Sequence, residues 1–297
     1  MTAQDSAIPS KAIAISTGTV LAGLGVFAFS FSFPATAWAL QGFGPWTSTG
    51  LRGVLAAAVA AACLATGRVP LPARRHRPGL LVVAAGCVVG FPLLTTLALR
   101  TSSTAHSAVV IGVLPLATAV ASALRTGARP TRTFWCAALA GAAAVLGFTL
   151  QQSHGSLSLA DLYLFGALLV CAAGYAEGGR LAREMPGWQV IAWGVLAALP
   201  VTALTAGLAL ATEPVRLTAH AVGGLAYLGL VSQFGGFVLW YRGMAAIGVP
   251  KASQLQLAQP LLTLLWAVLV LAERPSPAAP VTALAVLTCI AVTQRAR

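Results

Sequence analysis

The chain consists of apolar stretches about as long as a lipid bilayer is thick, joined by short polar loops. A helix of about 20 residues crosses a hydrocarbon core about 30 Å thick. Soluble domains carry about 25% charged residues, whereas this chain has 8% charged and 58% hydrophobic residues. The sequence therefore predicts an all-α integral membrane protein without an inserted soluble domain. We expect ten transmembrane helices, at residues 12–33, 46–66, 79–99, 105–124, 133–151, 160–181, 188–211, 219–241, 252–271 and 277–293.

The second half of the sequence repeats features of the first half. A shift of about 145 residues places Pro260 on Pro115 and overlays the Arg-Pro dipeptides at 274–275 and 129–130. Internal repeats in a membrane protein are typical of transporters whose site lies between the halves. The expected repeats are residues 1–151 and 152–297.

The loop charges predict the orientation. With a cytoplasmic N-terminus, the inner segments hold 14 of the 18 Lys and Arg residues and the outer segments hold three. Positive charge collects on the cytoplasmic side, so we expect both termini in the cytoplasm of a multi-pass protein of the bacterial inner membrane. Each repeat has five helices, an odd number, so the second repeat enters the membrane inverted. The run from Ala12 to Phe33 exceeds the apolar core of a signal peptide, about 7–15 residues, and is expected to be the first helix.

Several functional classes are disfavoured by the sequence. The net charge of +12 is spread over short loops, so we expect no nucleic-acid partner. The five cysteines lie in apolar stretches without a C-x-x-C pair, so we expect no metal site, disulfide or cofactor. Neither H-E-x-x-H nor G-x-S-x-G occurs, and no acid pair has helical spacing inside the membrane. Ser102, Ser103 and His106 cluster on the expected outer side, but we expect no orienting acid there and therefore no catalytic residues.

The last two helix pairs carry a family resemblance. The residues are Tyr241-x-x-x-Ala245, Pro260 and Leu271-Ala272-Glu273-Arg274-Pro275, together with Arg52 early in the second helix. With them, the chain resembles the EamA-like branch of the drug/metabolite transporter superfamily. The resemblance implies a central cavity among helices one, three, four, six, eight and nine, and export of amino acids or similar small metabolites by alternating access. Alternatives are another organic solute, drug-like or nucleotide-sugar-like, and a channel. The substrate, the coupling ion and the oligomeric state stay open.

Two departures from the family pattern limit what the resemblance implies. The first repeat has Ala128 where the second has Glu273, so this acid is not expected to be a symmetric device. No Asp or Glu occurs between Asp5 and Asp161. The drug–proton exchange of small multidrug relatives, which keep a carboxylate in their first helix, is therefore not carried over.

A polar face in the ninth helix is the main substrate-site candidate. Gln256, Gln259, Pro260 and Thr263 have the i, i+3, i+4, i+7 spacing of one helical face. Pro260 removes a helical N–H and frees a carbonyl nearby. In the fourth helix, the matching positions include the apolar Ile111 and Leu114. One polar and one apolar wall would suit a zwitterion with an organic side chain. The alternative is that the glutamines bond neighbouring helices.

Further candidates have structural alternatives. Aromatic and small polar residues suit an amino-acid pocket, although each aromatic could instead face lipid. The second set comprises Ser232, Gln233, Trp240, Tyr241, Phe91, Thr95 and Thr96. Glu177 is the one carboxylate well inside an expected span, where acids are commonly functional, but Arg180 at i+3 offers an ion pair. Arg52 either reaches outward or anchors a carboxylate. Gly86-x-x-x-Gly90 and Gly174-x-x-x-Gly178 favour close helix approach.

Overall fold

The structure, a computed structural model, describes residues 9–127, 131–152, 157–247, 255–256 and 258–295. All regular elements in these ranges are helical. Eight helical segments are long and apolar enough to cross a membrane, and shorter apolar helices follow at Ala258–Leu271 and Ala278–Val292. Ten crossings stay a prediction, because the start expected for the ninth helix lies partly outside the described residues.

The helical elements come in two series. Those of the first half are α1 (Pro9–Ser30), α2 (Ser32–Ala39), α3 (Pro45–Thr66), η1 (Arg74–His76), α4 (Arg77–Val83), η2 (Ala84–Gly90), α5 (Phe91–Ala98), α6 (Thr104–Ile111), α7 (Leu114–Thr126) and α8 (Arg132–Gln152). Those of the second half are α9 (Leu159–Leu181), α10 (Gly187–Thr212), α11 (Ala219–Ala226), η3 (Tyr227–Gly235), α12 (Gly236–Ile247), α14 (Ala258–Leu271) and α15 (Ala278–Arg295).

Prolines stand where several spans are interrupted or restart. Pro115 is the second residue of α7, and Pro260 is the third residue of α14. The N–H groups of a first helical turn have no partner within the helix, so proline costs little there. The structure thus places Pro260 at a helix start instead of within a continuous helix. The first span likewise continues through α2 to Ala39, beyond its expected end at Phe33, with Pro34 in the first turn of α2.

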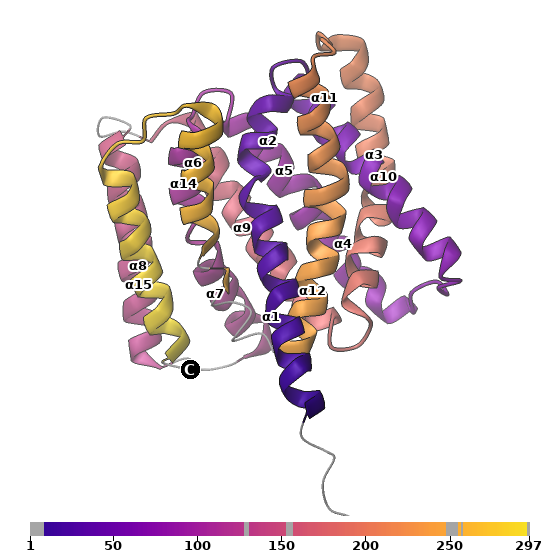
Figure 1. Ribbon diagram of the computed structural model, residues 1–297, viewed down its shortest axis with the longest axis horizontal. Helices are drawn as coiled ribbons and strands as arrows, with labels where there is room; N and C mark the ends of the chain where they lie inside the picture. Colours follow the sequence, from indigo (N-terminus) through magenta and orange to yellow (C-terminus); the bar gives the residue numbers. More distant parts are fainter. Residues whose placement is uncertain (1–8, 128–130, 153–156, 248–254, 257, 296–297) are drawn as a thin grey trace, which may run out of the picture.

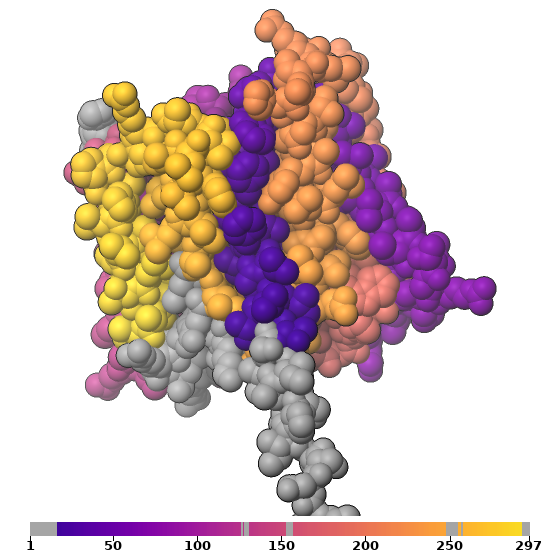
Figure 2. All heavy atoms as spheres, in the orientation of Figure 1, coloured from indigo at the N-terminus to yellow at the C-terminus, as the bar shows by residue number. Residues whose placement is uncertain are grey.

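The helices form one bundle with a pair at each edge. α3 packs along α10 at one edge, and α8 packs along α15 at the other (Figure 1). Between these pairs, α1 contacts both α12 and α14. Figure 2 shows the α1–α2 span running down this face between them. Residues from both halves of the chain therefore meet in the middle of the bundle.

Similar contacts recur in the two halves. α6 contacts α14, which is the counterpart of α7, the helix that follows α6, under the shift of about 145 residues. The first span packs on α12, and α9 packs on the third span in the same way. The third span of each half also contains a π-helical stretch. In the first half this is η2, within Arg74–Ala98, and in the second half it is η3, within Ala219–Ile247. Such stretches occur frequently at functional sites. These features agree with two repeats, while their inverted relation stays a prediction.

The third span, Arg74–Ala98, packs against α9 where Gly86 and Gly174 lie in contact. A Cβ added to Gly86 would lie 2.3 Å from the Val170 carbonyl oxygen and 3.1 Å from the Gly174 Cα. Backbone atoms cannot move away from such a contact as a flexible side chain can. The close approach predicted from the small-residue motifs is therefore confirmed at Gly86 and Gly174.

Candidate functional site

A cavity of about 270 Å³ lies among α7, α9 and α12, and we call it the inner cavity. α7, α12 and the first turns of α1 lie at the same end of the bundle (Figure 1). The lining residues are Pro115, Thr118, Ala119, Ser122, Arg125, Tyr175, Ala176, Gly179, Arg180, Arg183, Trp240, Tyr241, Met244 and Gln256. Three helices that are distant in sequence, together with Gln256, thus line one cavity with aromatic, hydroxyl, amide and basic groups.

The charges of the inner cavity have one sign. Arg125 lies near the end of α7, Arg180 near the end of α9, and Arg183 just beyond it. Among the described residues, the lining of the inner cavity contains no Asp or Glu. The buried Trp240 and Tyr241 come from α12. The arrangement can attract an anionic group with its arginines and hold an organic body against aromatic rings.

A much smaller space of about 20 Å³ lies between α6 and α14, and we call it the closed gap. A cavity needs about 10–15 Å³ of this kind of volume to hold one water molecule, so the gap has room for about one water and for no organic solute. Pro115 and Gln256 line both the closed gap and the inner cavity. The gap lining is Phe33, Ala108, Ile111, Gly112, Leu114, Pro115, Gln256, Gln259, Pro260 and Thr263.

The glutamine-face candidates therefore come together, but around a closed space. Gln256, Gln259, Pro260 and Thr263 oppose Ile111 and Leu114 across the closed gap. The Thr263 hydroxyl already contacts the carbonyls of Ser30 at 2.8 Å and Gln259 at 3.0 Å. Of this set, Gln256 is also in the lining of the inner cavity.

The third-helix candidates lie elsewhere. Phe91 and Thr95 belong to α5, which packs against α9, and neither is in the lining of the inner cavity or the closed gap. The Thr95 hydroxyl donates to the Phe91 carbonyl at 2.7 Å, and the Thr96 hydroxyl donates to the Pro92 carbonyl at 2.6 Å. Hydroxyls bonded to their own helix offer little to a ligand in this arrangement.

Arg52, Ser232 and Gln233 form a buried polar cluster. Arg52 Nε donates to Gln233 Oε1 at 2.9 Å, and Arg52 Nη2 donates to Ser232 Oγ at 3.3 Å. Gln233 Nε2 in turn donates to the Cys87 carbonyl at 3.2 Å, which connects η3 to η2. None of the ion pairs among the described residues includes Arg52, whose exposed fraction is 6%. Neutral oxygens thus stabilise a buried guanidinium that would be costly without partners.

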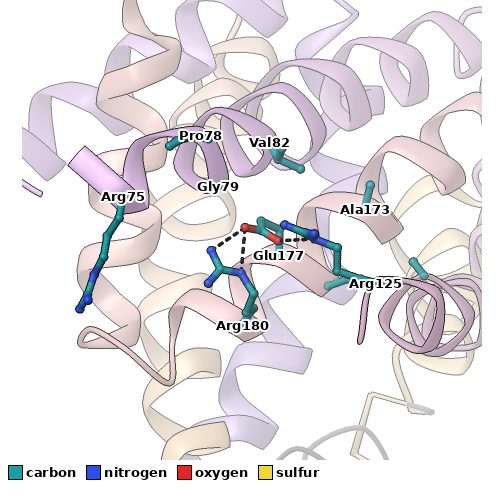
Figure 3. A pocket seen from close by; sticks show the side chains of 10 residues that line it. Arg75, Pro78, Gly79, Val82, Arg125, Ala173, Glu177 and Arg180 are labelled. Carbon is teal, nitrogen blue, oxygen red and sulfur yellow. Dashed lines mark hydrogen bonds and ion pairs between the residues drawn. The ribbon is translucent and has the colours of Figure 1, made fainter. Parts of the chain in front are cut away.

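Glu177 is held between two arginines (Figure 3). Arg180 contacts Glu177 Oε1 through Nη2 at 2.7 Å and Nε at 3.0 Å, and Arg125 Nε lies 3.3 Å from Oε2. Arg180 Nη1 also reaches Glu184 at 2.6 Å. The contact with Arg125 was missed in the sequence, because 52 residues separate it from Glu177 and only tertiary packing brings them together.

A carboxylate does lie beside His106, contrary to the sequence expectation. His106 Nε2 is 2.7 Å from Asp161 Oδ1, and Asp161 is fully buried at the start of α9. Ser103 Oγ accepts a hydrogen bond from the His106 backbone N–H as the cap of α6. The Ser103 hydroxyl therefore caps a helix instead of bonding to the imidazole, so these contacts are not those of a catalytic triad.

Two further glutamates bind helix starts: Glu273, which the family motif includes, and Glu213, which the sequence analysis did not single out. The Glu273 carboxylate accepts from the N–H groups of Thr104 and Ala105, both at 2.9 Å. Glu213 accepts in the same way from Trp46 at 3.3 Å and Thr47 at 2.8 Å, at the start of α3. Anionic groups are favoured at helix N-termini. The described residues contain no group of three or more His, Cys, Asp or Glu that could hold a metal ion.

The comparison with protein families places these features in a known group. The EamA-like transporter family matches residues 16–150 and again residues 158–294. The chain belongs to this family. It is thus a multi-pass membrane transporter of the drug/metabolite transporter superfamily, a family of transporters and not of enzymes.

One curated relative agrees with this membership, and one solved structure shares the fold. The chain is 42% identical over 272 residues to the uncharacterized transporter YdeK of Bacillus subtilis (strain 168), covering 92% of this chain and 95% of the relative. A crystal structure of a protein with 21% sequence identity has the same fold, with a TM-score of 0.65 over 93% of this chain and 96% of that one.

Proposed function

We propose that this EamA-family member exports amino acids or similarly small carboxylate-bearing metabolites. We also propose that its fold consists of ten transmembrane helices in two inverted repeats. In this proposal the inner cavity is the substrate site, open toward the cytoplasm. The single observation that carries it is the lining of that cavity, where Trp240, Tyr241 and Gln256 meet three arginines and no lining acid.

The chemistry of the lining fits a zwitterion. Arg183, which is in none of the ion pairs among the described residues, attracts the carboxylate, whereas Arg125 and Arg180 are already bound to Glu177. The Gln256 amide can donate to a carboxylate or accept from an ammonium group, and the Trp240 ring can face the ammonium. Drug-sized ligands occupy pockets of about 300–1,000 Å³, so a cavity of about 270 Å³ favours a small cargo over a drug-like or nucleotide-sugar-like solute.

The closed gap supports alternating access over a channel. A channel needs a continuous path, whereas the space between α6 and α14 holds about one water molecule. In an alternating-access cycle these two helices would separate as the inner cavity closes. Release to the outer side would follow.

Counterflow in proteoliposomes with a panel of labelled amino acids tests the proposal. We expect accumulation against internal unlabelled substrate, and none for labelled sugars or cationic drugs. Gln256→Leu should weaken apparent affinity about ten- to a hundred-fold, because a hydrogen bond to a charged group is worth about 1.5–3 kcal/mol. Gln41→Leu, at an exposed loop position away from both spaces, is the matched control. Unchanged transport in Gln256→Leu, or no counterflow with any amino acid, would contradict the proposed site.

A further inference from the structure

A second hollow, of about 380 Å³, lies beside the inner cavity, and we call it the side hollow. Figure 3 shows it from close by. Arg125, Ala176 and Arg180 line both spaces. The full lining of the side hollow is Arg75, Pro78, Gly79, Val82, Ala121, Arg125, Ala173, Ala176, Glu177 and Arg180.

The side hollow opens on the lateral surface of the helix bundle. α9 forms its floor, and α4 and α7 each pack against α9 as its walls. Val82 of α4 is 41% exposed, and Ala173 of α9 is exposed as well. In a membrane transporter, apolar side chains exposed at this position within the spans contact lipid. A lipid molecule can therefore enter the hollow from the side.

Three helical segments each contribute an arginine to the lining of this hollow, and Figure 3 shows the Arg75 side chain pointing away from Arg125 and Arg180. Arg75 belongs to η1, just before α4, while Arg125 and Arg180 lie in the last turns of α7 and α9. Glu177 is the acid of the lining, and Arg125 and Arg180 already bind it. Arg75 Nε lies 3.2 Å from His76 Nε2, which in turn lies 3.0 Å from Glu184 Oε2, and Arg75 itself has no carboxylate partner among the described residues. The lining therefore has an excess of positive charge.

The rest of the lining is apolar, which divides the side hollow into a basic part and an apolar wall. Pro78, Val82, Ala121 and Ala173 supply this wall. A phosphate diester on an acyl-chain anchor has the same division of charged head and apolar body. Basic pockets between helices on the cytoplasmic side commonly bind anionic lipid headgroups, and guanidinium groups bind phosphate oxygens well.

We propose that the side hollow is a binding site for the phosphate headgroup of an anionic phospholipid. Arg75 binds the phosphate, and the start of an acyl chain lies along Val82 and Ala173. The site goes beyond the proposed export of amino acids, since Arg75 does not belong to the inner cavity lining. The lipid would hold α4 and α7 against α9, the helix that they share.

The test measures lipid-dependent thermal stability of the purified full chain in neutral detergent. Dioleoylphosphatidylglycerol, dioleoylphosphatidylcholine and inorganic phosphate are titrated separately. Arg75→Gln removes one arginine of the site. Arg77→Gln, two positions away and also exposed but outside the lining, is the matched control. Ala173→Leu narrows the hollow without changing any charge. Substitutions at exposed positions should leave folding intact.

We expect phosphatidylglycerol to raise the Tm of the wild-type protein and of Arg77→Gln with the same half-saturating concentration. That concentration should increase about tenfold or more in Arg75→Gln, as a lost charge-assisted hydrogen bond predicts. It should also increase in Ala173→Leu. Equal responses to the two lipids, or equal half-saturation in Arg75→Gln and Arg77→Gln, would overturn the site. An equal shift with inorganic phosphate alone would show a free-anion site and overturn the assignment to lipid.

Discussion

Glu273 is expected to hold the outer end of the closed gap shut. It lies in the loop after α14, and it accepts hydrogen bonds from two N–H groups at the start of α6. α6 and α14 are the helices on either side of the closed gap. Separation of these helices would break both bonds, so Glu273→Ala should favour the state in which the gap is open.

The magnitude follows from the two contacts. Both are 2.9 Å long, and the donors, at Thr104 and Ala105, belong to buried residues. Hydrogen bonds to a charged group contribute about 1.5–3 kcal/mol each, and partial rehydration of the freed N–H groups returns part of this. We expect a net loss of about 2–4 kcal/mol in the closed state, which shifts the closed-to-open ratio at least tenfold.

Cysteine accessibility measures this shift. Ile111→Cys is placed in the closed gap of a variant whose five native cysteines are replaced. It is then labelled from the outer side with a membrane-impermeant maleimide. The labelling rate should rise at least about tenfold when Glu273→Ala is added, in proportion to the open population.

Glu213→Ala is the matched control for this experiment. Glu213 also binds two N–H groups at a helix start, that of α3, but it is not in the lining of the closed gap. It should lower thermal stability without increasing the labelling of Ile111→Cys. An unchanged labelling rate in Glu273→Ala, or an equal increase in Glu213→Ala, would refute the assignment of Glu273 to the gap.

Two further predictions concern Glu177 and Gly86. Glu177→Gln should keep about half of wild-type counterflow or more, since the amide oxygen still accepts from Arg180 and partly exposed ion pairs contribute little; complete loss in a folded, normally expressed protein would make Glu177 a coupling or substrate residue. Gly86→Val should destabilise the fold by about 3 kcal/mol, because its Cβ meets the Val170 carbonyl. Gly147→Val, whose Cβ meets nothing within 4 Å, is the control, and equal thermal unfolding of the two variants would contradict the reasoning.

The helical membrane fold followed from the sequence because its physical cause is local. A bilayer requires about 20 apolar residues with internally satisfied backbone groups, and such runs can be read directly. The repeat also followed, since Pro115 and Pro260 keep their spacing to neighbouring apolar runs. The structural role of these prolines was harder to predict from the sequence. Both stand in first helical turns, and a helix break of this kind depends on packing around it.

The candidate site was predicted in part. Gln256, Trp240 and Tyr241 belong to the inner cavity lining, and the sequence singled them out because polar and aromatic groups in apolar spans are costly to bury. Thr95 was singled out for the same reason, yet its hydroxyl bonds to its own helix. Composition identifies a polar group in a span but leaves undetermined whether backbone carbonyls already satisfy it.

The partners of most charged groups were decided by tertiary structure. Glu177 and Arg180 are three residues apart and share a helix face, so their ion pair could be anticipated. Arg125 with Glu177, Asp161 with His106, and Glu273 with the start of α6 are 52, 55 and more than 160 residues apart. Helical periodicity relates residues only within one turn or two, so such contacts arise only when the helices pack. The sequence by itself therefore determined the membrane helices and the repeat, whereas packing decided which polar groups bind each other and which remain to line a cavity.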